Sequence, residues 1–449
     1  MKRIVQIFSV ILFAVFVANS EELAPGTVIR DAEIEAILHS YTDPLFKVAH
    51  LNPKDLRLII VVSKDVNASA TFNTTITVLT GFLLKTERVD EIIGVFAHEI
   101  GHLAGNHLMG LTDAIDNAQK TSLLGTLAGV TLGVLTGRPD IALFSLAGGQ
   151  ATAIYSFSQF NRGQEAAADR MAIRFLHELC WPVDGLASFL HKLHGQELLR
   201  ESQQDPYLRT HPLTQDRVTT VHHAQETSCS KPFPKEMLEN YAILKMKLDA
   251  FLSPPYLVLE KYKGEGFLNH YAQVIAYYRL SDIGNALRIL DGLLKSPHAS
   301  PYLWELKGQI LYEHGKLKES IFCYEKALSL SPESPLLMLG LAQSLIGLEN
   351  KKVLGQAERV LRKMKEHEPE NALVLHYLSI VYGRQERMGE MALSLAEKEA
   401  LLGNWAEAKN QADRALHFLK PKDHAYLKAQ DLKNHISQEM DKKTKTQKF

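Results

Sequence analysis

The chain has 449 residues, of which 46% are hydrophobic and 22% are charged, and its formal net charge is -1. This length and ordinary globular composition favour two or three folded domains. The near-neutral charge gives no support for nucleic-acid binding through a basic surface, and three cysteines are too few for a dense disulfide framework.

Residues 1–20 have the pattern of a secretory signal peptide. A short basic head at residues 1–3 precedes a nearly uninterrupted apolar run at residues 4–17, and Ala18-Asn19-Ser20 provides small residues for cleavage. We predict that the mature chain begins at Glu21 and reaches an oxidising compartment. An uncleaved membrane anchor is the alternative.

The mature chain is predicted to begin with a helix and two strands. Asp31 can cap a helix over residues 31–49, where apolar residues recur at helical spacing. The apolar, β-branched runs at 56–62 and 76–84 predict strands, separated by a turn at 64–67. The second strand is expected to form an edge before the next helix, and such an edge can bind an extended peptide as an added strand.

The next helix, predicted over residues 89–108, carries the motif HExxH. His98 and His102 are four residues apart and therefore lie on one helix face, where two imidazoles can hold one zinc ion. Glu99 lies beside the first histidine, where a carboxylate can accept a proton from water. The alternative is a pair of core histidines, and the motif alone does not decide between the two interpretations.

A glycine-rich segment follows this helix. Residues 121–137 carry no charge, and every fourth residue on one helical face is a glycine: Gly125, Gly129, Gly133 and Gly137. A second apolar run covers residues 141–155. Because the uncharged run is at the short limit for crossing a bilayer, we predict that 122–150 is a helical hairpin that does not span a membrane. The alternative is a surface that contacts a membrane peripherally or receives an apolar substrate.

A second helix, predicted over residues 162–178, supplies acidic residues for the same site. Glu165 and Asp169 are four residues apart, which fits a third zinc ligand and an acid that accepts a hydrogen bond from a ligand histidine. Alternatively, the two acids form a solvated face or pair with Arg162 or Arg170. A loop rich in turn-forming residues is predicted at 205–212.

The chain changes character after residue 236, where helical patterns dominate. Residues 301–334 match the spacing of a tetratricopeptide repeat, through Trp304, Gly308, Gly315, Ser320, Tyr324, Ala327 and Pro332. Neighbouring units are degenerate, and an insertion lies near Asn350. We therefore predict a metallopeptidase domain at 21–230, a repeat solenoid at 236–440 and a lysine-rich, disordered tail at 441–449. An unrelated helical bundle is the alternative for the second domain.

The three cysteines allow one disulfide. Cys180 and Cys229 both lie in the closing segment of the first domain, so we predict that they pair and that Cys323 stays free. Two buried free thiols are the alternative.

The combined motifs make the chain similar to zinc metallopeptidases of the CAAX prenyl protease type. Their pattern of HExxH, a distant ExxAD and an HP pair followed by arginine corresponds here to His98–His102, Glu165–Asp169, and His211-Pro212 with Arg217. The resemblance implies one zinc ion per chain, bound by His98, His102 and Glu165, with Glu99 as the base. Ala167 departs from relatives that have a second glutamate there, which leaves the three ligands intact.

The same resemblance gives a role to His211 and Arg217. His211 is expected at the open side of the metal, either as a hydrogen-bond donor to the oxyanion or as a removable plug that binds the metal, and we favour the plug. Arg217 is expected to anchor this segment to an acid such as Asp169 or to pair with substrate. By its position alone, His211 would be a loop histidine without a role.

The resemblance also implies a fold and a function. The fold is expected to be mainly α, a zincin-like α+β domain with a small sheet followed by a tetratricopeptide-repeat solenoid. Secreted family members with this layout are periplasmic and act on outer-membrane proteins or their assembly machinery. We therefore predict a periplasmic zinc metalloendopeptidase for unfolded or misassembled outer-membrane proteins, with the repeats docking partners or clients. The alternatives are a chaperone-like assembly factor and a pseudoenzyme scaffold.

Overall fold

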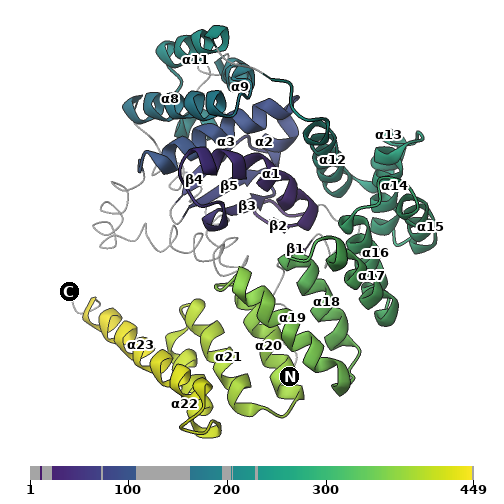
Figure 1. The fold of residues 1–449 in the computed structure, drawn as a ribbon, viewed down its shortest axis with the longest axis vertical. Helices are drawn as coiled ribbons and strands as arrows, with labels where there is room; N and C mark the ends of the chain where they lie inside the picture. The colour runs from purple at the N-terminus through teal and green to yellow at the C-terminus, as the bar shows by residue number, and fades with distance from the viewer. Residues whose placement is uncertain are drawn as a thin grey trace. The chain divides into compact units, whose positions relative to one another are not determined.

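The computed structural model describes residues 11–12, 23–71, 74–107, 162–194, 204, 206–227 and 231–446. Its fold is mainly helical with one small sheet, as predicted, and contacts divide it into two compact units that meet in sequence at Ile289 and Leu290 (Figure 1). No helix in these ranges is long and apolar enough to cross a membrane. The predicted hairpin at 122–150 lies outside the described residues.

The sheet of the first unit has the strand order β1-β2-β3-β5-β4. Its strands are β1 (Ile11–Leu12), β2 (Val28–Arg30), β3 (Arg57–Val61), β4 (Ala68–Thr71) and β5 (Thr75–Leu79). β3 and β5 are parallel, whereas β4 pairs antiparallel with β5. The predicted edge strand, β5, is therefore an interior strand, and the edge is β4, which the sequence did not predict. β1 falls in the predicted signal peptide, whose cleavage stays a prediction.

The predicted strand at 76–84 was too long. β5 ends at Leu79, and residues from Thr80 form the short helix α2 (Thr80–Lys85). The apolar run continues through both elements, and such a run does not distinguish a buried strand from a buried helix. The change from strand to helix occurs at Thr80. Its hydroxyl accepts a hydrogen bond from Ser63 N at 3.1 Å and thereby joins the start of α2 to the segment that follows β3.

The predicted first helix is confirmed as α1 (Ala32–Val48). Asp31 is its N-cap, and one carboxylate oxygen accepts hydrogen bonds from Glu33 N at 3.1 Å and Ile34 N at 2.9 Å. A capping side chain satisfies backbone N–H groups that have no partner within the helix, which fixes where the helix begins.

The motif helix α3 (Val89–Ala104) is buried, and two other helices, α8 (Arg162–Glu178) and α9 (Asp184–His194), pack against it (Figure 1). Glycines allow the close approach. A Cβ at Gly101 would lie 2.7 Å from Ala168 O, and one at Gly94 would lie 2.6 Å from Leu186 N. Gly101, inside the HExxH motif, therefore lets the helix that carries Glu165 pack directly against the two histidines.

Two further helices complete this side of the first unit. The predicted loop at 205–212 contains a five-residue helix, α10 (Pro206–Thr210), and it is followed by α11 (Gln215–Thr227). This short helix positions a site residue, because His211 N donates to Tyr207 O at 2.8 Å and so continues the helical turn.

The helices after residue 236 do not all group with the repeats. The first unit includes α12 (Lys235–Leu252), α13 (Pro255–Lys261) and α14 (Phe267–Arg279). The buried Lys247 of α12 lies 2.8 Å from Asp31 Oδ1 and 3.0 Å from Glu33 Oε2, at the start of α1. The structure divides at 289 rather than at the predicted boundary of 236, and a buried ionic contact attaches α12 to the first unit.

The second unit consists of consecutive helices that pack against one another, as a tetratricopeptide-repeat solenoid requires. They are α16 (Pro301–Glu313), α17 (Leu317–Leu330), α18 (Pro335–Gly347), α19 (Leu354–His367), α20 (Ala372–Arg384), α21 (Met388–Leu401), α22 (Trp405–Phe418) and α23 (His424–Thr446), preceded by α15 (Ile283–Leu294). The predicted insertion is a short 3-10 helix, η4 (Lys351–Val353), capped by Asn350. The tail predicted to be disordered from 441 is helical to Thr446, since lysine is a good helix former.

The cysteines agree with the predicted pairing as far as the structure describes them. Cys180 is disulfide-bonded, and Cys323 is free and buried. The predicted partner, Cys229, lies outside the described residues. Burial raises the pKa of the Cys323 thiol to about 11, so this cysteine is unreactive at neutral pH.

Mass mapping of the non-reduced protein is expected to find one linked peptide pair, containing Cys180 and Cys229. Cys323 is expected to react with an alkylating reagent only after unfolding, because it is buried and its thiolate is scarce. Detection of three alkylated thiols in the unreduced, unfolded protein would contradict the disulfide.

Candidate metal centre

Three helices bring four potential metal ligands together. His98 and His102 come from one face of α3, Glu165 comes from α8, and His211 follows α10. One ligand atom from each residue lies within 4.8 Å of all the others, and the four side chains are at most 1% exposed. The structure therefore joins the three ligands expected from the sequence and adds His211 to them.

The donor atoms in this cluster fit a cation. His98 Nδ1 lies 2.8 Å from Asp169 Oδ1, a contact that places the ring proton on Nδ1 and a lone pair on Nε2. That Nε2 lies 3.1 Å from His102 Nε2, and the latter lies 3.1 Å from Glu165 Oε1. Two ring nitrogens and a carboxylate converge on one point, which is the donor set of a zinc site with two histidines and one glutamate.

The ionisation of His102 and Glu165 agrees with this assignment. Burial lowers the pKa of His102 to about 3, which keeps its imidazole neutral, as a metal ligand must be. Burial opposes ionisation of Glu165, but the neighbouring His211 and His98 outweigh it and hold the pKa of this carboxyl well below its usual range. Burial also disfavours protonation of His98, yet the Glu165 and Asp169 carboxylates raise its pKa to about 9, so without a metal this imidazole is protonated at neutral pH and must release a proton to become a ligand.

Glu99 is placed as a base beside the ligands. Its Oε2 accepts a hydrogen bond from Ala70 N, on the edge strand β4, at 2.7 Å. Within the described chain, Oε1 has no hydrogen-bond partner, and it lies 3.5 Å from His211 Nε2. Burial raises the pKa of the Glu99 carboxyl, which makes the carboxylate a stronger base. One oxygen is therefore held, and the other is directed toward the cluster.

Arg217 of α11 supports the acidic residues. Its Nε and Nη2 lie 2.6 and 2.9 Å from the two oxygens of Asp169, and its Nη1 lies 2.5 Å from Glu165 Oε2. The same Nη1 donates to Pro212 O at 3.0 Å. The guanidinium thus pairs with two buried carboxylates and also contacts the segment that carries His211, which is the anchoring contact expected for Arg217.

Three residues in this site were not predicted from the sequence. Ala70 contributes only its backbone N–H, and His107 places its Nδ1 3.0 Å from His102 Nδ1. Tyr207 stacks on the His211 ring, with ring centroids 4.5 Å apart. A backbone donor leaves no signal in the sequence. The spacing of four residues between Tyr207 and His211 indicates that their side chains share one helix face, but only once α10 is known to be helical.

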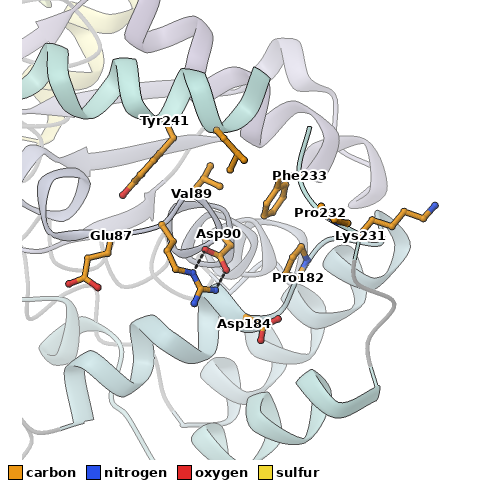
Figure 2. Close-up of a pocket in the computed structure, with 11 residues that line it drawn as sticks. Glu87, Val89, Asp90, Pro182, Asp184, Lys231, Pro232, Phe233 and Tyr241 are labelled. Carbon is orange, nitrogen blue, oxygen red and sulfur yellow. Dashed lines mark hydrogen bonds and ion pairs between the residues drawn. The ribbon is translucent and has the colours of Figure 1, made fainter. Parts of the chain in front are cut away.

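A pocket of about 540 Å³ lies away from this cluster, at the N-terminus of α3 (Figure 2). Its lining includes Phe233, Tyr241 and the ion pair between Arg88 and Asp90, and it contains none of the four potential ligands. We assign the chemistry to the buried cluster, because that is where the donor atoms converge.

Comparison with known proteins is consistent with this geometry. Residues 30–225 match the model of peptidase family M48, and residues 301–334 match a tetratricopeptide repeat. The beta-barrel assembly-enhancing protease of Yersinia pestis is 24% identical over 332 residues, which are 72% of this chain and 67% of that protein.

Other relatives align over a shorter region. The beta-barrel assembly-enhancing protease of Escherichia coli K12 is 23% identical over 203 residues, or 44% of this chain and 40% of that protein. A putative protein of the same name from Vibrio cholerae is 25% identical over 190 residues, or 41% and 38%. The alignments thus span about two fifths of the length of these two relatives.

Proposed function

We propose that this chain, which joins a peptidase family M48 domain to C-terminal tetratricopeptide repeats, is a zinc-dependent metalloendopeptidase. One observation carries the proposal: the ligand atoms of His98, His102 and Glu165 converge in a buried cluster, beside an oxygen of Glu99 that accepts no hydrogen bond from the described residues. In the proposed site these three residues hold zinc, which supplies Lewis-acid polarisation of the scissile carbonyl and activation of water.

The residues around the ligands have separate tasks in the reaction. Glu99 takes the proton from the attacking water on its free oxygen and passes it to the leaving amine. The Ala70 N–H holds the other oxygen, so the carboxylate cannot rotate away from the cluster. Asp169 fixes the ring proton of His98 on Nδ1, and Arg217 fixes Asp169 in turn.

We propose that His211 blocks the metal site in the resting enzyme. Its Nδ1 lies 3.3 Å from His98 Nε2 and 3.2 Å from Glu165 Oε1, so it could occupy the position that a catalytic zinc would leave to water or substrate. All of these side chains are buried, so a peptide can reach them only after a covering segment moves, and we propose that this is the segment that carries His211. His211 therefore acts as a removable fourth ligand that keeps the peptidase idle until a client displaces it.

Removal of this imidazole is expected to activate the enzyme. His211→Ala should raise basal cleavage of an unfolded protein and cause self-cleavage, because the position reserved for substrate is no longer blocked. If His211 instead donates to the oxyanion, the variant should lose about 10²–10³ in kcat. His191→Ala, an exposed histidine on the neighbouring helix α9, is the matched control. A His211→Ala variant that is indistinguishable from wild type contradicts both roles.

Metal analysis tests the ligand assignment. The mature protein should contain one zinc ion per chain, and His102→Ala and Glu165→Gln should lose it together with peptidase activity, because each variant removes one of three ligands. Glu178→Gln, an exposed glutamate on the same helix as Glu165, should keep both. If Glu165→Gln binds zinc as tightly as wild type, the third ligand is assigned wrongly.

The proposed clients follow from the names of the relatives. Several are called beta-barrel assembly-enhancing proteases, which favours a periplasmic enzyme whose clients are unfolded or misassembled outer-membrane proteins. The repeats are proposed to dock such clients or their assembly machinery. Exposed apolar side chains on α17, Phe322 and Leu330, provide suitable contacts on the repeat unit.

A further inference from the structure

Tyr207 connects the metal centre to the packed core beside it. Its ring lies 4.5 Å from the His211 ring, centroid to centroid, with an angle of 25° between the planes. The ring of Phe189, on α9, meets Tyr207 edge-on at 5.3 Å, and Phe189 in turn meets Phe82 of α2 edge-on at the same distance. All three aromatic side chains are buried. The tyrosine ring is therefore fixed in the core and offers one face to the imidazole.

The backbone joins the two rings into one unit. His211 N donates to Tyr207 O at 2.8 Å, so both residues belong to the same helical turn. Tyr207 N donates to Val66 O at 3.3 Å, which attaches this turn to the segment before β4. An imidazole directly after a short helix can rotate about its side-chain bonds, and the stacked ring favours the orientation that faces Glu165 and Glu99.

The Tyr207 hydroxyl is energetically unfavourable in this arrangement. The oxygen is buried and has no hydrogen-bond partner in the part of the chain that the structure describes. A buried polar group without a partner is costly, and the cost disappears when the group reaches water. The hydroxyl therefore destabilises the closed arrangement relative to any state in which α10 has moved outward.

We propose that Tyr207 is a positioning residue: its ring holds His211 in the metal centre by stacking, and its unpaired hydroxyl weakens that hold so that a client can displace His211. The inference rests on the proposed role of His211 as a removable ligand. It predicts that the ring and the hydroxyl of one side chain have opposite effects on the resting enzyme.

Two variants of Tyr207 separate the effects, with His211→Ala measured in parallel. In Tyr207→Leu the stacked ring is lost, so basal cleavage of an unfolded protein should rise toward that of His211→Ala. In Tyr207→Phe the ring remains and the unpaired hydroxyl is gone, so basal cleavage should fall about fivefold or more and the melting temperature should rise. The two substitutions should thus move the basal rate in opposite directions from wild type.

A second readout does not depend on activity. In the Co²⁺-substituted protein, the d–d absorption of the metal depends on its coordination number and ligands, so it should change when His211 leaves the site. Tyr207→Leu should show the same change in the Co²⁺ spectrum as His211→Ala, whereas Tyr207→Phe should keep the wild-type spectrum. If Tyr207→Leu does not fold, Phe189→Leu, which removes the support behind the tyrosine ring, should give the same spectral change in weaker form.

These measurements distinguish failure of the role proposed for His211 from failure of the role proposed for Tyr207. If His211→Ala leaves the rate and the spectrum unchanged, the proposed role of His211 fails, and the inference fails with it. If His211→Ala activates but Tyr207→Leu matches wild type in both readouts, His211 keeps its role and Tyr207 does not position it. If Tyr207→Phe raises basal cleavage, the hydroxyl strengthens the closed state, and its proposed effect is wrong.

Discussion

Glu99→Gln is expected to lower peptide hydrolysis by about 10²–10⁴-fold while the protein keeps its fold and the zinc proposed for the site. The glutamine oxygen can still accept the hydrogen bond that Ala70 N donates to Glu99 Oε2, so the side chain stays in place. The amide that replaces the free oxygen cannot accept a proton from water. The three ligands are unchanged, so metal content measured beside kcat should match that of wild type.

Glu91→Gln is the matched control for this experiment. Glu91 is also a fully buried glutamate on α3, but it accepts hydrogen bonds from Ser188 Oγ at 2.7 Å and Lys192 Nζ at 3.0 Å and is not part of the metal cluster. The turnover of Glu91→Gln should be close to that of wild type when equal amounts of folded protein are compared. Wild-type turnover by Glu99→Gln would rule out the proposed base.

The same variant separates proteolysis from a chaperone-like function. If outer-membrane proteins mature fully in cells that contain only Glu99→Gln, binding through the repeats is the main function, and cleavage is secondary. If maturation fails together with cleavage, proteolysis is required. Because the inactive variant should hold clients without cutting them, crosslinking in the native envelope can also identify the clients.

Arg217→Met is expected to lower the free energy of unfolding by about 3–5 kcal/mol, the largest stability effect that we predict. The guanidinium makes two contacts with Asp169 and one with Glu165, and all three side chains are at most 2% exposed. Without the arginine, two carboxylates would remain buried close together. Urea unfolding in the presence of a chelator measures this effect separately from any loss of metal.

Two other substitutions define what Arg217 contributes. Arg174→Met on α8 removes an exposed ion pair with Glu178, whose N–O distance is 3.6 Å, and should change stability by less than about 1 kcal/mol. The free energy of unfolding of Arg217→Lys should lie between those of Arg217→Met and Arg174→Met. An ammonium supplies the charge but cannot make the paired contacts of a guanidinium. If Arg217→Met is as stable as Arg174→Met, the buried network does not stabilise the fold.

The sequence by itself determined the parts of this protein that depend on local periodicity. His98 and His102 share a face of α3 because they are four residues apart, and the same spacing places Glu165 and Asp169 on one face of α8. The helical repeat at 301–334 was likewise visible from spacing. These features could be predicted because a helix fixes the relation between residues three or four positions apart.

Only the tertiary structure decided the parts that depend on contacts between distant segments. The apolar run after residue 76 divides into β5 and α2, and the unpredicted β4 forms the sheet edge that holds Glu99 through Ala70. The buried contacts of Lys247 attach α12 to the first domain, which the composition change at 236 did not indicate. Apolar runs fit strands and helices equally well, and a backbone donor or a buried ion pair leaves no periodic signal, so packing makes the choice.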